Sequence, residues 1–448
     1  MGKIAAGRGD GARGLAVGWG AGGPNLISLS LEGEGRRGEG VRVSGGEAMQ
    51  RYAVAGLIIA LCLTTLAPGS AGAPASTVRV GAVIPLTGRF AGGGAQVKAG
   101  YEIAVEDINA RGGVRVGDQR LPLELTILDD ESDPTKTVSR LEALAGQGVV
   151  VFLGGFGSDL HAAAAAVAEK NKIPYCGVAF ALHAIHQQGF KYLFSPFVKS
   201  PDIAIGIYRF LNASVPADQR PRRVAIFSER TDWGRELQRL WTTRSTEYGY
   251  QVVQSDEYTV GTRDFSDIIL RAKAAGADAV FSVPTPPDGL ALVRQMKELD
   301  FTPKVILMIR AADAVSWNQA LGKDGDYVLL APGWHHAFNF PGVAELNAKH
   351  QQRFGRPADV ITGPSYACVQ IVADAVERAG KLDPLAIRDA MAATNLQTVE
   401  GPVRFRPDGT GIVPFVLVQW QNGTQQLVWP KELGAVPFQY PARPWRER

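Results

Sequence analysis

The chain has 448 residues, of which 46% are hydrophobic and 20% are charged. This length exceeds what one hydrophobic core usually supports, so at least two lobes are expected. The formal net charge of +3 comes from 47 basic and 44 acidic residues without a basic block, which argues against nucleic acid as a partner.

The first 75 residues differ in composition from the rest of the chain. Residues 1–48 contain 15 glycines and sustain no apolar period, so we expect a non-native or disordered leader, with a genuine long leader as the alternative. Residues 49–75 have one arginine, an apolar run and then small residues, which is the layout of a signal peptide cleaved after Ala75. We therefore expect Met49 to be the initiator and the mature protein to be exported.

Strand-like runs alternate with amphipathic helical patterns from Val78 onward, which predicts parallel sheets flanked by helices. Asp133 and Pro134 form a helix start, because an N-cap residue is followed by proline at the first helical position. In this first series we expect strands over residues 78–86, 121–130, 148–155 and 172–180, and helices over residues 96–109, from 134 and from 158.

A second series of similar size begins after residue 201. We expect strands over residues 222–229, 250–260, 277–284 and 303–310, and helices over residues 233–248, 265–275 and 288–299. There follow a strand at 326–334, helices at 343–354 and 365–379, a short helix and a β-rich tail from residue 401.

This order of elements predicts two α/β lobes joined by three crossings. The crossings are expected at about residues 196–202, 330–335 and 398–402. The first lobe would then comprise residues 76–199 and 333–399, the second residues 200–332 and 400–435, and residues 436–448 would form a tail. A ligand is expected in the cleft between the lobes, at the carboxyl ends of the strands.

The stretch "FLGGFGSDLH", residues 152–161, leads from a strand through a glycine loop into a helix. Backbone N–H groups and the helix dipole favour an anion at such a helix start. The loop has no Gly-Lys-Ser/Thr ending and lacks the third glycine of a dinucleotide fingerprint, so a nucleotide is not expected. A carboxylate remains as the expected ligand, with helix capping by Ser158 or Asp159 as the alternative.

The sequence gives little support for catalysis or metal binding. Ser158 lies in "FGSDL" rather than in the G-x-S-x-G pattern of a hydrolase nucleophile. The pairs His183/His186 and His335/His336 lack a third ligand at metal-site spacing. We therefore expect neither an enzyme nor a bound metal or other cofactor.

Two cysteines, Cys176 and Cys368, remain after the signal peptide. They are far apart in sequence and have no metal-site spacing. A disulfide and two buried free thiols are both compatible with the sequence.

Several stretches of the mature chain resemble a known family in their order along the sequence. They are "IPLTGRFAGGGAQVKAGYEIAVEDINARGGV", "DDESDPTKTVSRLEALAGQGVVVFLGG", "GFKYLFSP", "RDFSDIILRAKAAGADAVF" and "GPVRFRPDGTGIVPFVLVQWQNG". The chain is similar to the periplasmic branched-chain amino-acid-binding proteins, the type I solute-binding components of ABC transporters. The resemblance implies an α/β type I periplasmic-binding-protein fold, with two Rossmann-like lobes and three crossings.

The resemblance also implies a carboxylate site in the first lobe. The family's serine after the third strand corresponds to Ser158, beside Gly157, and its backbone contact after the fourth strand corresponds to Ala179. The family's threonine falls on Ala181, which departs from the pattern.

An aromatic residue that often lines the family's pocket falls at or near Gly93. The resemblance therefore implies a wider pocket, in which Phe90 or Phe180 would replace the missing contact.

Around the ligand's body, the resemblance implies an aromatic residue of the second lobe at Trp233, and we expect further contacts from Thr285 and Trp334. The family's acidic residue for the ligand's ammonium falls near Arg310, which cannot accept a hydrogen bond from an ammonium group. Arg310 is expected to be either a second anion contact, which we favour, or the ion-pair partner of an acid such as Asp313.

These residues together predict a binding protein for a small carboxylate with an apolar or aromatic body. A branched-chain or other hydrophobic amino acid and an aromatic or other organic acid all remain open. The resemblance implies a monomer in the periplasm that closes on its ligand and delivers it to the permease subunits of an ABC transporter. A ligand sensor of the same fold is the alternative.

Overall fold

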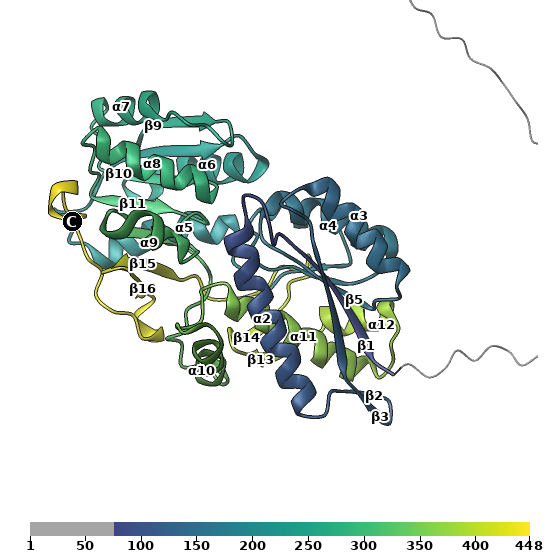
Figure 1. Ribbon diagram of the computed structural model, residues 1–448. Helices are drawn as coiled ribbons and strands as arrows, with labels where there is room; N and C mark the ends of the chain where they lie inside the picture. Colours follow the sequence, from purple (N-terminus) through teal and green to yellow (C-terminus); the bar gives the residue numbers. More distant parts are fainter. Residues whose placement is uncertain (1–75) are drawn as a thin grey trace, which may run out of the picture. The chain divides into compact units, whose positions relative to one another are not determined.

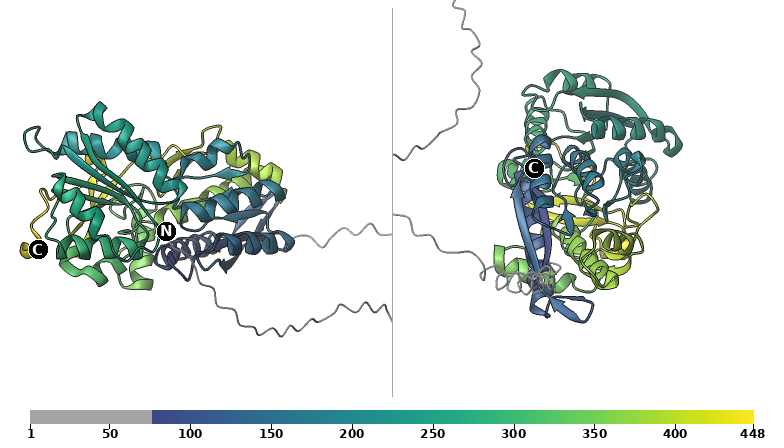
Figure 2. Two further views of the ribbon diagram at one scale, coloured as in Figure 1. Left: turned by 90° about the horizontal axis from the view of Figure 1, so that it is seen from above. Right: turned by 90° about the vertical axis from the view of Figure 1, so that its right-hand side faces the viewer.

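The computed structural model describes residues 76–448. The expected leader and signal peptide lie outside the described residues. Residues 76–448 form an α/β structure with two large sheets, each flanked by helices (Figures 1 and 2), so the expected fold class is confirmed. Within these residues, no helix is both long and apolar enough to cross a membrane.

The first lobe is built on a five-stranded parallel sheet in the order β4-β1-β5-β6-β7. Asp133 caps helix α3 by accepting hydrogen bonds from two backbone N–H groups, with Pro134 at the first helical position, as the sequence predicts. The strands are β1 (Val78–Ile84), β4 (Leu123–Asp129), β5 (Val151–Leu153), β6 (Tyr175–Cys176) and β7 (Leu193–Phe194), and the helices are α2 (Ala91–Ala110), α3 (Pro134–Gly146) and α4 (Ser158–Asn171).

The second lobe is built on a seven-stranded sheet in the order β16-β15-β12-β11-β10-β8-β9. Its strands are β8 (Arg223–Glu229), β9 (Gln251–Tyr258), β10 (Ala279–Val283), β11 (Val305–Met308), β12 (Val328–Leu330), β15 (Leu417–Gln421) and β16 (Thr424–Trp429). Its helices are α5 (Ser200–Ser214), α6 (Asp232–Ser245), α7 (Ser266–Ala274), α8 (Pro286–Glu298) and α9 (Ser316–Leu321). The pairs β12–β15 and β15–β16 at one edge are antiparallel, and the other strand pairs are parallel.

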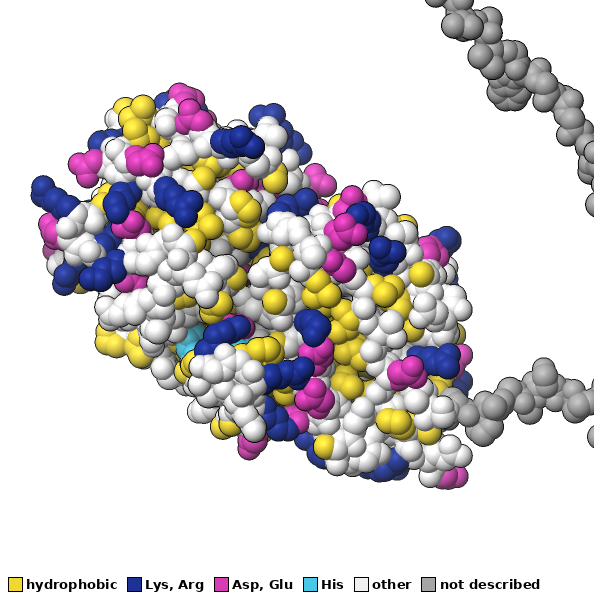
Figure 3. Space-filling view, viewed as in Figure 1, with side chains coloured by type: hydrophobic (Ala, Val, Ile, Leu, Met, Phe, Trp, Pro, Cys, Tyr) yellow, Lys and Arg dark blue, Asp and Glu magenta, His cyan; other side chains and the backbone are white. Residues whose placement is uncertain are grey.

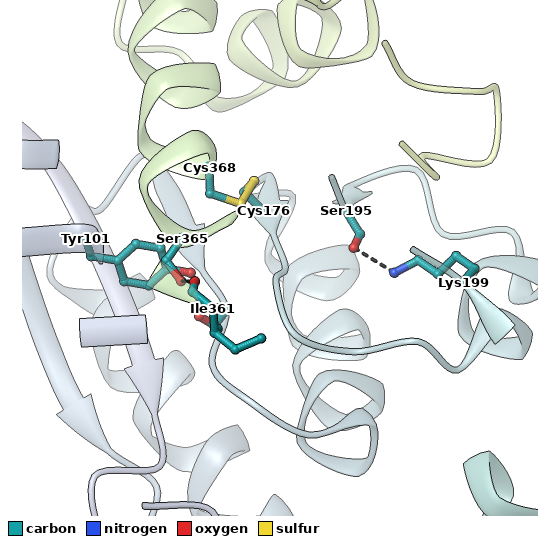
Figure 4. Close-up of a disulfide and its surroundings, with 8 residues drawn as sticks. Tyr101, Cys176, Ser195, Lys199, Ile361, Ser365 and Cys368 are labelled. Carbon is teal, nitrogen blue, oxygen red and sulfur yellow. Dashed lines mark hydrogen bonds between the residues drawn. A yellow bond between two sulfur atoms is a disulfide. The ribbon is translucent and has the colours of Figure 1, made fainter. Parts of the chain in front are cut away.

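After β12 the chain returns to the first lobe, where helix α11 packs against α2. The returning elements are α10 (Val343–Phe354), α11 (Thr362–Ala379), α12 (Pro384–Ala392) and the hairpin β13 (Asn395–Thr398) and β14 (Gly401–Arg404); a small hairpin, β2 (Val114–Val116) and β3 (Gln119–Leu121), extends the same lobe. A disulfide between Cys176 and Cys368 ties β6 to α11 (Figure 4), so the free-thiol alternative is wrong.

The third crossing between lobes lies later in the chain than residues 398–402. Hairpin β13–β14 spans the expected boundary at residues 399 and 400, because its two strands pair directly across it. Thr410 still pairs with Ser195 of the first lobe, so the chain leaves that lobe only between Gly411 and the start of β15.

The last residues of the chain pack on the second lobe. Trp445 is buried and donates a hydrogen bond from its indole N–H to the carbonyl of Phe301, and the N–H of Ala442 bonds the carbonyl of Lys304. On the face shown in Figure 3, acidic and basic side chains are interspersed over both lobes.

Candidate ligand-binding site

Helix α4 begins at Ser158 without a capping side chain. Its N-cap residue is Gly157, whose φ of 111° lies in a region that glycine adopts without strain. Within the described residues, no side-chain cap bond forms at this N-cap, so capping by Ser158 or Asp159 is not what places these residues here. Ser158 is buried, and the first-turn N–H groups at a helix N-terminus favour an anion.

A short loop after β6, residues 179–181, lies beside this helix start. Ala179 has a φ of 51°, and a left-handed residue in such a turn lets successive N–H groups converge on an anion. All three carbonyl oxygens of the loop accept hydrogen bonds within the protein. These donors compensate the partial negative charge of the oxygens, which would otherwise repel an anion. The donors are the Gly157 N–H to Ala179 at 3.2 Å, Lys199 Nζ to Phe180 at 2.8 Å and the Ser200 hydroxyl to Ala181 at 2.8 Å.

Lys199 is a buried basic residue behind this loop. It also donates to Ser195 Oγ at 2.7 Å (Figure 4), and its Nζ lies 3.6 Å from the centroid of the Phe180 ring. Burial lowers the pKa of Lys199 well below its usual value. The ring of Phe180 stacks with those of His161 and His186, at centroid distances of 4.3 Å and 5.6 Å, so Phe180 belongs to this buried cluster and does not replace the missing aromatic contact.

The second lobe brings four side chains to the carboxyl ends of its parallel strands. Glu229 is the last residue of β8, and Trp233 lies in the first turn of α6, which follows β8. Thr285 caps helix α8 after β10, and Arg310 follows β11. The indole N–H of Trp233 donates to the Ser200 hydroxyl at 3.1 Å, which holds the ring close to the loop of the first lobe.

Arg310 forms a buried ion pair with Glu229. Of the two expectations, the ion pair with a nearby acid is therefore present, with Glu229 in place of Asp313 as the acid. The Nε of Arg310 donates to the carbonyl of Pro284 at 3.3 Å, and its guanidinium carbon lies 5.0 Å and 4.9 Å from the ring centroids of Phe90 and Trp233. Burial acts to lower the pKa of Arg310, but the charge and hydrogen bond of Glu229 outweigh it and raise that pKa above its usual value.

These groups surround a small cavity between the two lobes. The centres of water-sized molecules can occupy about 70 Å³ of it. Five of the expected contact residues line this cavity, namely Phe90, Ser158, Trp233, Thr285 and Arg310. Other lining residues include the ion pair Arg89–Asp159 on the first-lobe side and Leu182, Glu229, Thr231, Asp232 and Val260.

A second, smaller cavity of about 20 Å³ on the same scale shares Trp233 and Arg310 with the first. Ala179 and Ala181, the two expected loop contacts, line this second cavity. Its other walls are Phe156, Phe197, Ile203, Ile309, Asp313 and Ala331, so all of them except Asp313 are apolar. The loop that is suited to an anion therefore lines the second cavity, whereas Ser158 lines the first.

Two expected features of the pocket differ in the structure. The space that a side chain at Gly93 would need is filled by Phe156, since a Cβ there would lie 2.4 Å from the Phe156 ring, so the pocket is not widened. Trp334 is fully buried and donates from its indole N–H to the carbonyl of Val399 at 2.9 Å. Trp334 therefore serves the core of the protein and lies outside both cavities.

Sequence analysis missed two residues of this site. Glu229 could have been found, because an acidic residue at the carboxyl end of a parallel strand faces the place where such sheets bind ligands. Phe156 gave no signal, since a phenylalanine in a glycine loop has no preferred partner before the fold is known.

A model of the periplasmic binding protein family matches residues 77–425, so the chain belongs to this family. Among curated relatives, the Leu/Ile/Val-binding protein homolog 7 of Brucella abortus (strain 2308) is 24% identical over 392 residues, covering 83% of this chain and 96% of the relative. The Leu/Ile/Val-binding protein homolog 1 of the same strain is 28% identical over 354 residues, covering 77% and 91%. The expected resemblance is thereby confirmed.

Solved structures show the same fold. The leucine-binding protein LivK of Thermotoga maritima MSB8 has a TM-score of 0.72 at 24% identity, covering 80% of this chain and all of that one. LivJ of Streptococcus pneumoniae in complex with isoleucine has a TM-score of 0.69 at 19% identity, covering 79% and 100%. A solute-binding protein of R. palustris in complex with benzoate has a TM-score of 0.67 at 17% identity, covering 79% and 95%.

Proposed function

We propose that this protein is the extracytoplasmic solute-binding component of an ABC transporter and captures a small carboxylate between its lobes. The observation that carries the proposal is the uncapped N-terminus of α4, where Ser158 faces Trp233 and Arg310 of the other lobe across the cavity. A carboxylate placed there accepts hydrogen bonds from N–H groups. Binding of this kind needs neither a proton transfer nor a metal ion.

The surroundings of this anion site favour an apolar or aromatic body for the ligand. Phe90 of the first lobe and Trp233 of the second both contribute aromatic side chains to the wall of the cavity. Arg310 offers further N–H donors but little net charge, because Glu229 balances it. Relatives named for leucine, isoleucine and valine and solved structures that hold isoleucine or benzoate support this class, since all of these ligands carry a carboxylate on an apolar body.

Transport would follow from closure of the lobes on the ligand. Ser158 belongs to the first lobe and Trp233 to the second, so a ligand that contacts both stabilises the closed arrangement. The permease subunits would recognise that arrangement, and the protein would act in the periplasm as a monomer.

A ligand screen with a matched pair of variants tests this proposal. The chain from residue 76 onward is screened by thermal shift against amino acids, aromatic acids, dicarboxylates and the corresponding amides, and the best acid is measured by calorimetry. Ser158→Ala should weaken its binding by about 10- to 100-fold, the range for a hydrogen bond to a charged group. Ser266→Ala, at the first residue of helix α7, is the control and should leave the affinity unchanged.

Two outcomes would contradict the proposal. If the amides stabilise the protein as strongly as the acids do, the site does not recognise a carboxylate. If the Ser158 and Ser266 variants bind the best acid equally well, the start of helix α4 does not contact the ligand.

A further inference from the structure

A buried lysine lies behind the loop at residues 179–181 without an acidic partner. Lys199 is 4% exposed, and its Nζ donates to two uncharged groups, the Phe180 carbonyl at 2.8 Å and Ser195 Oγ at 2.7 Å (Figure 4). Within residues 76–448, no hydrogen bond joins this Nζ to a carboxylate. Burying an amino group without an opposite charge costs free energy that an apolar side chain would avoid, so a lysine here calls for an explanation.

Two backbone N–H groups of the same loop are also without a partner. Phe180 and Ala181 are each 2% exposed, and neither N–H donates a hydrogen bond within the described part of the chain. The next N–H, that of Leu182, donates to Ser158 Oγ at 3.4 Å. Since buried N–H groups are nearly always paired, two adjacent unpaired ones indicate a place for an acceptor that the protein itself does not supply.

The hydrogen bond from Lys199 fixes the direction of one of these N–H groups. In a trans peptide the C=O and N–H bonds point to opposite sides, so the peptide between Phe180 and Ala181 presents its N–H away from the group that holds its carbonyl. Lys199 lies on the carbonyl side and lines neither cavity, whereas Ala181 lines the second cavity. The N–H of Ala181 is thereby directed to the cavity side of the loop.

Lys199 is itself held by the segments that join the two lobes. It directly precedes helix α5, the first helix of the second lobe. Ser195, which accepts its second hydrogen bond, is bonded through its backbone to Gly409 and Gly411 just before the third crossing, at 3.0 Å and 2.8 Å. A change at Lys199 can therefore alter the direction of the loop's N–H groups without altering a residue that lines either cavity.

We propose that Lys199 is a positioning residue for the ligand's carboxylate, because by holding the Phe180 carbonyl it directs the N–H of Ala181 at that carboxylate. This inference rests on the proposed function and deepens it, since Lys199 acts on the ligand only through the loop. Without the lysine, the peptide between Phe180 and Ala181 is free to turn, and the carboxylate loses one donor.

Calorimetry with leucine, isoleucine, benzoate and succinate as probe acids gives the first test, on the chain from residue 76 onward. Lys199→Met keeps the length of the side chain and removes its donors. It should weaken the acid that binds best about 10-fold or more, the loss expected for one hydrogen bond to a charged group. Lys273→Met is the control, because Lys273 donates to the carbonyl of Leu299 at 2.8 Å on the surface of the second lobe, and it should leave the affinity unchanged.

An NMR measurement separates positioning from a general effect on the fold. The chain from residue 76 onward contains two Phe–Ala pairs, Phe90–Ala91 and Phe180–Ala181, so labelling phenylalanine carbonyls with carbon-13 and alanine with nitrogen-15 gives two HNCO signals. Phe180→Leu, which removes one of them, assigns both. At saturating acid the amide proton of Ala181 should shift downfield in the wild type, because it then bonds a carboxylate, and Lys199→Met should lose this shift at saturation. The N–H of Ala91 already donates within the protein and is the reference.

Ser195→Ala gives the same test if Lys199→Met does not fold, because it removes one of the two acceptors that hold Nζ, and it should reduce both the affinity and the Ala181 shift by a smaller factor. An Ala181 shift that is absent from the wild type, or that persists undiminished in these variants, would overturn the role of Lys199 alone if Ser158→Ala still weakens binding. Failure of every acid to bind would overturn the proposed function as well.

Discussion

Removing both partners of the buried ion pair between Glu229 and Arg310 should change the free energy of unfolding little. Removing only one partner should lower it strongly. The two side chains are only 3% and 5% exposed, so water does not screen a charge that loses its partner. Glu229→Gln and Arg310→Met are each expected to lower the free energy of unfolding by about 3 to 5 kcal/mol. The double variant should come within about 2 kcal/mol of the wild type, because no buried charge is then left alone.

The two single variants should not be equal. Arg310→Met also removes the hydrogen bond to Pro284 and the contacts of the guanidinium with Phe90 and Trp233, which are worth about 0.5 to 2 kcal/mol. Glu229→Gln keeps the size of the side chain and leaves an acceptor for the Thr231 hydroxyl, which lies 2.9 Å from the carboxylate. The arginine variant should therefore be the less stable of the two.

Urea denaturation of the ligand-free chain from residue 76, followed by tryptophan fluorescence at pH 7, measures all four proteins. The quantity of interest is the coupling energy of the double-mutant cycle, expected at about 4 kcal/mol or more. A double variant that loses the sum of the two single effects would show that the ion pair is not coupled, and the argument from burial would then be wrong.

Two further predictions concern the first lobe. Replacing Cys176 and Cys368 by serine should lower the free energy of unfolding by about 3 to 5 kcal/mol, because the disulfide closes a loop of 192 residues. Urea denaturation of the wild type and the double serine variant measures this difference. If the same difference remains after the wild-type disulfide is reduced, the disulfide is not its cause. Burial lowers the pKa of His161 to about 3 despite its hydrogen bond to the Gly157 carbonyl, so the folded state binds fewer protons than the unfolded state between pH 3 and 6.5. The stability that neutral His161 contributes is therefore present above pH 6.5 and is lost as the pH falls. His161→Phe should reduce the slope of the free energy of unfolding against pH by about 1.4 kcal/mol per pH unit between pH 6 and 4. An unchanged slope in urea denaturation would show that His161 becomes protonated without unfolding.

The fold could be predicted from the sequence because local rules and hydrophobic periodicity agree along most of the chain. Asp133 before Pro134 predicts the start of α3, and the expected helix over residues 343–354 matches α10. The crossing after β14 could not be placed, because the pairing of β13 with β14 and of Ser195 with Thr410 depends on contacts far apart in sequence.

The candidate site was predictable on its anion side and less so on the other. The start of α4 at Ser158 follows from a glycine loop between a strand and a helix, a local pattern. Phe180 was expected to replace the aromatic contact missing at Gly93, and Trp334 was expected to contact the ligand's body. Both side chains instead have partners elsewhere in the chain and lie in buried clusters. Such competition between a cleft and a core depends on tertiary packing, which no local pattern records.

The charges of the two cavities explain why the anion side alone does not define the ligand. Ser158 and the start of α4 can hold any carboxylate, so discrimination between carboxylates must come from groups that the carboxylate does not occupy. Glu229 is already neutralised by Arg310 and gains little from a second cation. The walls of the second cavity are apolar apart from Arg310 and Asp313. The fit of the ligand's body against these walls is therefore expected to separate one carboxylate from another.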